Sequence, residues 1–151
     1  MHTLNIDSPL GKLSLYEREG AIIALRFGPA PAAAGDGAPV LRQAARFLER
    51  YFAGRAGPCE LPLDPGGTRF QKQVWRLMRE IPYSETATYA DFAGRLKSVP
   101  RAVGQACGAN PIPILIPCHR VLGSSGRLGG FSGGKGLPTK LDLLRREGAL
   151  L

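Results

Sequence analysis

The sequence predicts two lobes: an N-terminal α/β lobe made of an antiparallel sheet and a helix, and a mostly helical C-terminal lobe. Three observations predict this division. Short apolar runs fill residues 1–28, three prolines and three glycines fall within residues 55–67, and later segments repeat apolar residues at helical spacing. We therefore place the lobes at residues 1–66 and 67–151.

The first lobe begins with strands. Leu13 and Leu15 alternate with polar residues, and a second apolar run over residues 21–27 follows a Glu-Gly turn. Residues 40–53 then repeat apolar side chains three and four positions apart, which predicts an amphipathic helix ending before Gly54. Residues 55–67 read as the linker between the lobes.

The second lobe begins with a helix over residues 68–81, which opens on a capping-box-like Thr-Arg-Phe-Gln sequence and closes at Pro82. A second helix is expected from residue 88 to 96, and a third from about residue 98 to 108 with Pro100 in its first turn. Two short helices joined by a few residues in a basic region resemble a helix-turn-helix.

The third of these helices has an unusual surface. It is small at alternate positions, and only Arg101 and Gln105 offer polar groups for base edges. Such a helix is suited to close contact with a nucleic-acid backbone or minor groove without sequence selection. The alternative is an ordinary helix pair packed by small residues. Its small positions are Ala102, Gly104, Ala106 and Gly108.

A last helix is expected from about Leu137, with Leu137, Leu141 and Leu144 facing inward and Gly148 as its cap. Glu147 falls in its final turn, where a carboxylate opposes the helix dipole. We therefore expect a compensating partner for Glu147, with His119 as one choice and solvent as the alternative.

Charge is distributed unevenly along the chain. The net charge is +8, with seven Lys/Arg and seven Asp/Glu in residues 1–66 and thirteen against five in residues 67–151. This predicts a polyanionic partner for the second lobe, with nucleic acid ahead of membrane. A generally arginine-rich proteome is the alternative. No apolar run approaches the ~20 residues of a membrane helix, and residues 1–7 lack signal-peptide features, so we expect an intracellular protein without a membrane partner.

The number and spacing of the three cysteines and two histidines argue against a metal site and against a disulfide framework. Cys59, Cys107 and Cys118 form no CxxC pair, and their odd number argues against paired disulfides. We therefore expect no metal and no cofactor.

Cys118 is the strongest candidate for chemistry, because it precedes the internal histidine, His119, and follows a strand-like apolar run at residues 114–116. A thiol beside a base is a candidate nucleophile. Pro117 ends the run, Arg120 adds positive charge, and a glycine-rich segment follows, as in an exposed site. On the dipeptide alone, a buried structural cysteine remains an equal alternative.

Residues 114–121, Ile-Leu-Ile-Pro-Cys-His-Arg-Val, resemble the active-site signature of the O6-alkylguanine-DNA alkyltransferases, also called methylated-DNA-protein-cysteine methyltransferases. The similarity is specific and covers most of the second lobe, whereas residues 1–66 match in general pattern. It continues through residues 70–89, 100–104, 110–113, 124–126, 131–134, 140 and 143–147.

The resemblance implies a ribonuclease-H-like first lobe and a winged-helix-like second lobe. It also implies direct-reversal DNA repair without a cofactor. The alkyl group of O6-alkylguanine, and of O4-alkylthymine as an open second case, moves from a base flipped out of duplex DNA to a cysteine. The thioether is stable, so each molecule reacts once. We expect a monomer that contacts DNA through the minor groove and backbone and that is located in the cytoplasm with the nucleoid.

The resemblance also implies roles for individual residues. Cys118 is the acceptor, and His119 is its base through a water molecule. Glu147 orients the imidazole and Asn110 braces the turn. The base-binding residues it implies are Tyr89, Val121, Ser132 and Lys140, where Lys140 holds the pocket loop and the backbone at residues 118, 121 and 132 reads the base edge.

DNA contacts are implied at seven positions. Arg101 replaces the extruded base in the stack, and Tyr89 presses on the adjacent phosphate. The remaining contacts are Thr88, Ala102, Gln105, Arg120 and Ser124. The segments at residues 95–100 and 131–139 differ in length from the family pattern, which leaves the preferred size of alkyl group open.

Two other classes of protein fit parts of this pattern. A papain-like thiol hydrolase shares the thiol and imidazole but needs an oxyanion hole and turnover. A binding module, either a helix-turn-helix regulator or an alkyltransferase-like lesion binder, shares the basic helices. The lesion binders replace the reactive cysteine, and Cys118 is present here.

Overall fold

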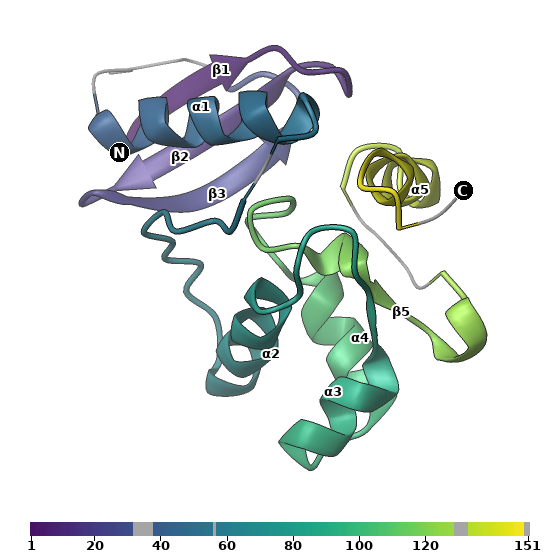
Figure 1. Cartoon of the computed structure of the whole chain (residues 1–151). Coiled ribbons are helices and arrows are strands. Elements are labelled where there is room, and N and C mark those ends of the chain that lie inside the picture. Colours follow the sequence, from purple (N-terminus) through teal and green to yellow (C-terminus); the bar gives the residue numbers. More distant parts are fainter. Residues whose placement is uncertain (32–37, 56, 129–132, 150–151) are drawn as a thin grey trace. The chain divides into compact units, whose positions relative to one another are not determined.

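The chain divides into two compact units, Met1–Gly66 and Gly67–Leu151, each described here by itself (Figure 1). The structure is a computed structural model that describes residues 1–31, 38–55, 57–128 and 133–149. The predicted fold class is confirmed: a sheet with one helix comes first, and a mostly helical unit follows.

The first unit is a three-stranded antiparallel sheet in the order β1-β2-β3, with β1 at His2–Ile6, β2 at Leu13–Arg18 and β3 at Ala21–Phe27. Glu19 and Gly20 both have positive φ angles, 52° and 83°, which is the backbone of a tight hairpin turn between β2 and β3. The predicted strands and turn are therefore confirmed.

Helix α1, Pro39–Phe52, packs on this sheet. Leu41, Ala44 and Leu48 on the helix are fully buried, as are Leu13 and Leu15 on β2. Because these residues recur at helical and at strand spacing, the two elements bury one apolar face each.

Among its described residues, the second unit contains four α-helices. These are α2 Arg69–Arg79, α3 Tyr89–Leu96, α4 Pro100–Gly108 and α5 Leu137–Arg146. Reciprocal capping boxes begin α2, at Thr68 and Gln71, and α3, at Thr88 and Asp91. A short parallel pair joins β4, Ala87–Thr88, to β5, Val121–Leu122, and so fixes the start of α3 beside the chain that follows Cys118.

Helices α3 and α4 form the predicted helix-turn-helix. Lys97 ends α3 in the left-handed conformation with a φ of 53°, and α4 starts at Pro100 three residues later. Helix α2 holds this pair, because the indole N–H of Trp75 donates to the carbonyl of Ala106 at 2.8 Å. Trp75 is buried, as its helical position predicts.

The apolar run before Cys118 is a buried turn rather than the strand that the sequence suggests. Pro113 and Ile116 form an isolated bridge, and Ile114 between them has a φ of 73°. Prolines on both sides remove N–H donors, so the run cannot join a regular ladder. The amide of Asn110 fastens the turn instead: Nδ2 donates to Ile116 O at 2.8 Å.

One expectation for α5 is wrong. Leu137, predicted to face inward, is 45% exposed, because it is the first residue of the helix. Leu144 is fully buried as predicted, Leu143 is fully buried beside it, and Leu141 is partly buried.

Candidate active site

Cys118 starts a 3-10 turn, η1, that spans Cys118–Arg120. The turn follows the buried run described above, and its backbone is fixed at both ends. Cys118 N–H donates to Ile116 O at 2.8 Å, and Arg120 N–H donates to Pro117 O at 3.0 Å. The backbone that carries the sulfur is therefore fixed by hydrogen bonds rather than part of a free loop.

The thiol of Cys118 is held mainly in its protonated form by burial, which raises its pKa. Four groups oppose this shift. A hydrogen bond from the side chain of Asn110 lowers the pKa, as do the positive charge of Lys140 and the backbone N–H groups of Cys118 and His119. The site is thus neutral in the free protein but carries the groups that stabilise a thiolate once a base removes the proton.

His119 is completely buried and bonded to Glu147 through Nε2 and Oε2 at 2.5 Å. Burial lowers the pKa of the imidazole, and the hydrogen bond and charge of Glu147 act in the opposite direction. With Nε2–H donating to the carboxylate, the lone pair of the ring lies on Nδ1. That buried atom has no hydrogen-bond partner within the described residues, so Nδ1 of the imidazole can still accept a proton.

Glu147 accepts hydrogen bonds from two segments of the chain, the turn η1 and the segment around Ser84. Its carboxylate accepts His119 Nε2, Arg120 Nε at 2.7 Å, Arg120 Nη2 at 3.2 Å, and the backbone N–H of Ser84 at 3.3 Å. These donors offset the unfavourable position of a carboxylate at the C-terminal end of α5. Of the two partners considered from the sequence, His119 is therefore found and solvent is excluded.

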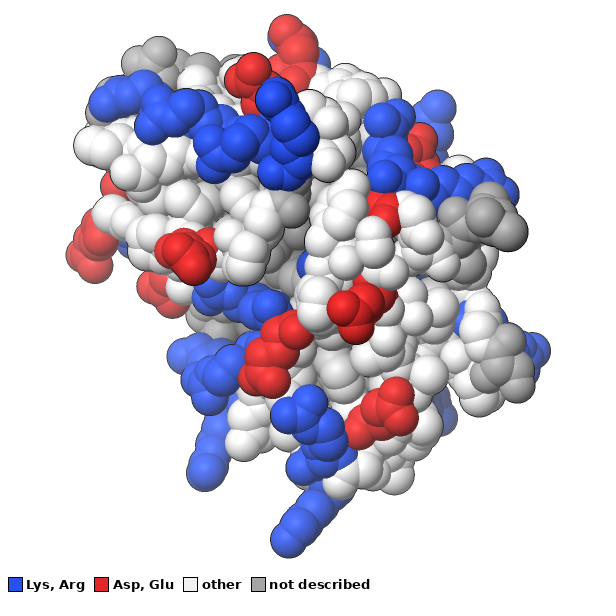
Figure 2. All heavy atoms as spheres, viewed as in Figure 1, with Lys and Arg blue, Asp and Glu red and all other residues white. Residues whose placement is uncertain are grey.

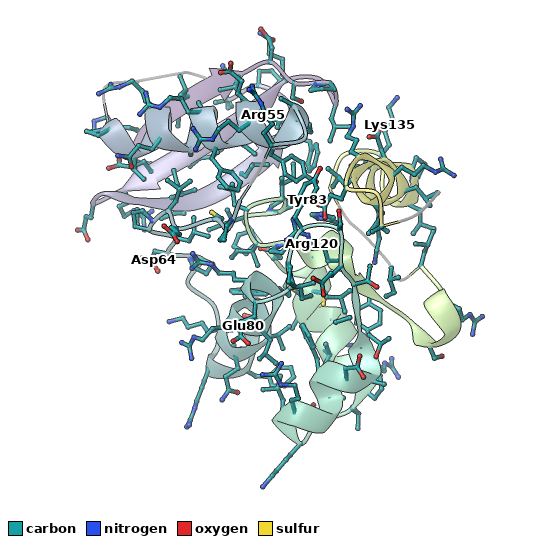
Figure 3. The ribbon with its side chains drawn as sticks, viewed as in Figure 1. Arg55, Asp64, Glu80, Tyr83, Arg120 and Lys135 are labelled. Carbon is teal, nitrogen blue, oxygen red and sulfur yellow. The ribbon has the colours of Figure 1, made fainter. Side chains whose placement is uncertain are left out.

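Arg120 is placed differently from the expectation of a DNA contact. Besides its fork on Glu147, its Nη1 donates to Ile81 O at 2.8 Å, and the guanidinium lies 5.8 Å from the centre of the Tyr83 ring. Its side chain is 11% exposed, and Figure 3 shows it turned toward Tyr83 in the interior of the unit. All three guanidinium nitrogens are bonded within the protein, so we assign Arg120 to positioning Glu147.

Lys140, Tyr89 and Val121 form a second bonded group. Lys140 is fully buried, and its Nζ donates to Val121 O at 2.8 Å and to the Tyr89 hydroxyl at 3.4 Å. Burial lowers the pKa of Lys140, and burial raises the pKa of Tyr89 to about 12, so the phenol keeps its proton. The bond to Val121 ties α5 to the backbone that follows the cysteine, and the predicted role of Lys140 in holding the pocket loop stays a prediction.

Cys107, at the end of α4, belongs to the same electrostatic neighbourhood. Burial raises its pKa, the charge of Cys118 acts in the same direction, and Lys140 opposes both. Burial holds both thiols in their protonated form, and they differ in the groups that would stabilise a thiolate. Besides Lys140, Cys118 has the side chain of Asn110 and two backbone N–H groups, whereas Cys107 has one backbone N–H group.

Four of the seven residues predicted to meet DNA lie on α4 and η2, outside this bonded set, whereas Tyr89 and Arg120 belong to it. Arg101 and Gln105 are exposed on α4, Ala102 is partly exposed, and Ser124 is exposed in η2, Ser124–Gly126. Thr88 is the N-cap of α3, and its hydroxyl accepts from Asp91 N–H at 3.0 Å.

The small face of α4 is open. A Cβ atom built on Gly104 or Gly108 would meet no atom of the described residues within 4 Å. These glycines therefore do not pack the helix pair internally, and the alternative of an ordinary hairpin packed by small residues is not supported at these two positions.

Ser132 lies outside the described residues. Sequence reasoning missed Ser84, Tyr83 and Ile81 as supports of the site. Ser84 Oγ also donates to the backbone carbonyl of Glu147, and the Tyr83 hydroxyl donates to Arg146 O at 3.2 Å. The family-like stretch 82–89 marked this segment, but its bonds to the end of α5 span 63 residues and have no local signal.

Within the described ranges, no group of three or more His, Cys, Asp or Glu side chains is arranged to hold a metal ion. A search of the same residues finds no helix with the length and apolar character that crossing a membrane requires.

A helix-turn-helix, followed along the chain by a thiol whose neighbouring histidine is bonded to a glutamate, is typical of a nucleic-acid-binding protein with a candidate nucleophilic cysteine. Two family models match the chain. Residues 69–149 match the DNA binding domain of 6-O-methylguanine DNA methyltransferase, and residues 1–65 match its ribonuclease-like domain. The chain belongs to the 6-O-methylguanine DNA methyltransferase family.

Individual relatives agree along nearly the whole length. A methylated-DNA–protein-cysteine methyltransferase of Methanosarcina barkeri is 43% identical over 94% of both chains. One from Mycolicibacterium paratuberculosis is 39% identical over 94% of this chain and 89% of its own. The crystal structure of Mycobacterium tuberculosis OGT in complex with DNA superposes with a TM-score of 0.84 at 37% identity, covering 99% of this chain and 94% of that one.

Proposed function

We propose that this chain, as a methylated-DNA–protein-cysteine methyltransferase that repairs DNA by direct reversal, takes the alkyl group from O6-alkylguanine in duplex DNA onto Cys118. The observation that carries the assignment of Cys118 is the neighbouring imidazole, which is bonded to Glu147 through Nε2 and presents an unpaired Nδ1. A base with one fixed tautomer and one available lone pair is what activation of a thiol requires.

In the proposed reaction, the sulfur of Cys118 forms a bond to the alkyl carbon as the bond from that carbon to O6 breaks. The thiol proton passes to Nδ1 of His119 through a water molecule. The departing guanine takes up one proton, supplied in net by the imidazolium of His119 that the thiol proton produced, so the imidazole ends neutral and the protons balance without an outside acid. The thioether has no leaving group that water can displace, and each molecule therefore reacts once.

The buried groups around the sulfur would orient the flipped base. Tyr89 keeps its hydroxyl proton, because burial raises its pKa to about 12, and so can donate to the base. Lys140 holds Val121 O at 2.8 Å and thereby fixes the backbone that meets the base edge. We assign the same reading role to the backbone of Cys118 and of Ser132.

For DNA, we propose a minor-groove contact by α4. Its open glycine positions allow a close approach to the sugar-phosphate backbone, and exposed Arg101 at its first turn fills the gap that the flipped base leaves. Thr88, Ala102, Gln105 and Ser124 would add backbone contacts. Every residue in this proposal comes from one chain, so a monomer suffices, and we place it with the nucleoid in the cytoplasm.

Intact-protein mass spectrometry tests the reaction. Incubation with excess duplex containing O6-methylguanine should add one methyl group per molecule, on the peptide that contains Cys118. A hydrolase would release product repeatedly without gaining mass, and a lesion binder would do neither. Cys118→Ser should abolish transfer and leave duplex binding nearly unchanged; transfer that survived would refute the choice of nucleophile.

Base flipping has its own test. Arg101→Ala should slow repair of duplex DNA more than reaction with free O6-benzylguanine base, because unstacking costs a few kcal/mol that the free base never incurs. Equal losses on both substrates would exclude the proposed place of Arg101 in the stack.

A further inference from the structure

The outer face of α1 carries arginines that the proposed alkyl transfer does not use. Arg42, Arg46 and Arg50 are exposed and follow one another at four-residue spacing. Four residues advance a helix by about 6 Å and return to nearly the same side. Figure 2 shows the resulting line of basic side chains along α1.

Arg55 extends this line past the end of the helix. Gly54 takes a φ of 76°, and the N–H of Arg55 donates to the carbonyl of Arg50 at 2.9 Å. Arg55 is exposed and lies at the end of α1 in Figure 3. We call Arg42, Arg46, Arg50 and Arg55 the arginine row.

Three members of the arginine row, Arg46, Arg50 and Arg55, have charges that no described acidic side chain pairs with. Glu49 is the acidic residue of α1. The guanidinium groups of these three arginines therefore remain available to an external anion.

The arginine row is also a local concentration of charge within a neutral unit. Residues 1–66 hold seven Lys/Arg and seven Asp/Glu, and four of the seven basic residues are those of the arginine row. A generally basic composition would spread its charges over the unit, so composition alone does not account for one basic face on a neutral body.

We propose that the arginine row binds the phosphate backbone of duplex DNA, as an electrostatic contact in addition to the helix-turn-helix. Each strand of a duplex presents a phosphate every ~3.4 Å along its axis, so successive arginines about 6 Å apart can each find a phosphate. Guanidinium binds phosphate in a two-pronged fashion. The inference rests on DNA being the substrate of this protein; a second copy, with a net charge of +8 as well, is repelled rather than attracted.

The test compares two variants with the same change in charge. Arg42→Gln/Arg46→Gln/Arg50→Gln removes three charges from the arginine row, and Lys12→Gln/Arg18→Gln/Arg26→Gln removes three from the sheet side of the same unit. Binding to an undamaged duplex of about 30 base pairs is measured by fluorescence anisotropy over a range of salt concentrations. Each lost phosphate contact lowers the slope of log K against log salt by about 0.9.

We expect the arginine-row variant to lose a slope of about 2 to 3 and at least tenfold in affinity at low salt, while the sheet variant keeps the wild-type slope. Replacement of the same three arginines by lysine should restore the slope. A wild-type slope in the arginine-row variant, or equal losses in both variants, would overturn the proposal.

Two further readouts make the result specific. Reaction with free O6-methylguanine base, which needs no duplex, should be unchanged in both variants; if the wild type transfers no methyl group from either the free base or the duplex, the proposed function has failed rather than this inference. Sedimentation of the protein alone should be the same for all forms. A different result would overturn the proposal: the wild type self-associates, the arginine-row variant does not, and the salt dependence of DNA binding is the same in both. The arginine row would then bind a second copy of the chain.

Discussion

The imidazole of His119 is both neutral and fixed in one tautomer. Burial lowers its pKa, which keeps the ring neutral, and the bond to Glu147 keeps the proton on Nε2. A neutral ring can accept a proton only on the nitrogen that lacks one. The carboxylate therefore directs basicity toward Nδ1 without itself touching the thiol.

His119→Gln should lower the single-turnover rate of alkyl transfer by about 10²-fold or more, because general-base catalysis contributes on that scale. Quenched-flow measurement with a duplex containing O6-methylguanine provides the rate, and Cys118→Ser provides the zero. Duplex affinity should stay the same. A rate within twofold of wild type would mean that the thiol is activated by other groups.

Arg120→Lys should destabilise the protein by about 1–3 kcal/mol, because lysine keeps the charge but cannot form the fork on the buried carboxylate of Glu147. Urea unfolding measures this loss. The salt slope of DNA binding should not change, whereas Arg101→Gln should lower it by about 1. A smaller slope for an Arg120→Gln variant would restore Arg120 to the DNA contacts.

The sequence made the pair Cys118 and His119 visible because the two residues are neighbours in the chain. Glu147 was visible as a carboxylate in an unfavourable position that needed a partner. Arg120 was predicted to contact DNA because positive charge next to a reactive residue suggests an anionic ligand, whereas the structure bonds its guanidinium within the protein. Its real partners, Glu147 and Ile81, come from two other segments and leave no local pattern.

Among the elements, the helices were predictable from caps and periodicity, and both capping boxes form as written in the sequence. The turn before Cys118 was not. Its residues are as apolar as those of a buried strand, and the distinction lies in Asn110, whose Oδ1 accepts from Ile112 N–H at 2.9 Å while Nδ2 holds Ile116. Such local side-chain bonds replace a ladder and are not readable from hydropathy.

Helix α4 provides a test in which stability and binding change in opposite directions. Gly104→Ala should stabilise the protein by about 0.5–1 kcal/mol, because alanine favours a helix and the added methyl group meets nothing within the described residues. The same methyl group should weaken duplex binding if the face of α4 approaches the DNA backbone.

Gly94→Ala on α3 is the matched control, since its Cβ also meets no described atom within 4 Å. It should raise the melting temperature without loss of DNA affinity. Equal DNA affinity in both alanine variants would show that α4 does not approach DNA closely at Gly104.

At the scale of the whole molecule, the net charge of each unit predicted which unit binds nucleic acid. It did not predict where charged side chains cluster on the surface of either unit. The excess of positive charge in residues 67–151 pointed to a nucleic-acid partner. The neutral sum over residues 1–66 hid the arginine row, because a net charge carries no information about which face of a helix its members share.

Stability should depend on pH through His119. Below about pH 6.5 the unfolded chain binds a proton on this residue that the folded chain resists, so the free energy of unfolding falls as the pH falls. Thermal unfolding between pH 5 and pH 7 measures the effect. The decline in melting temperature should be shallower in His119→Gln, and an unchanged decline would mean that other groups control it.

Glu17 affects stability at lower pH than His119. Its pKa is lowered chiefly by its bond to His2, so its contribution to the free energy of unfolding is lost as the pH falls through that lowered pKa.

The dense surroundings of Cys118 have a consequence for the fate of the protein after its one reaction. An alkylated sulfur is larger, can no longer become a thiolate, and no longer uses the bond from Asn110 in the same way. Excess volume in a packed interior costs typically 1–3 kcal/mol, a large share of the margin by which a domain stays folded. Under the proposed reaction, spent molecules therefore unfold more readily than fresh ones, and ordinary proteolysis clears them in preference to working copies.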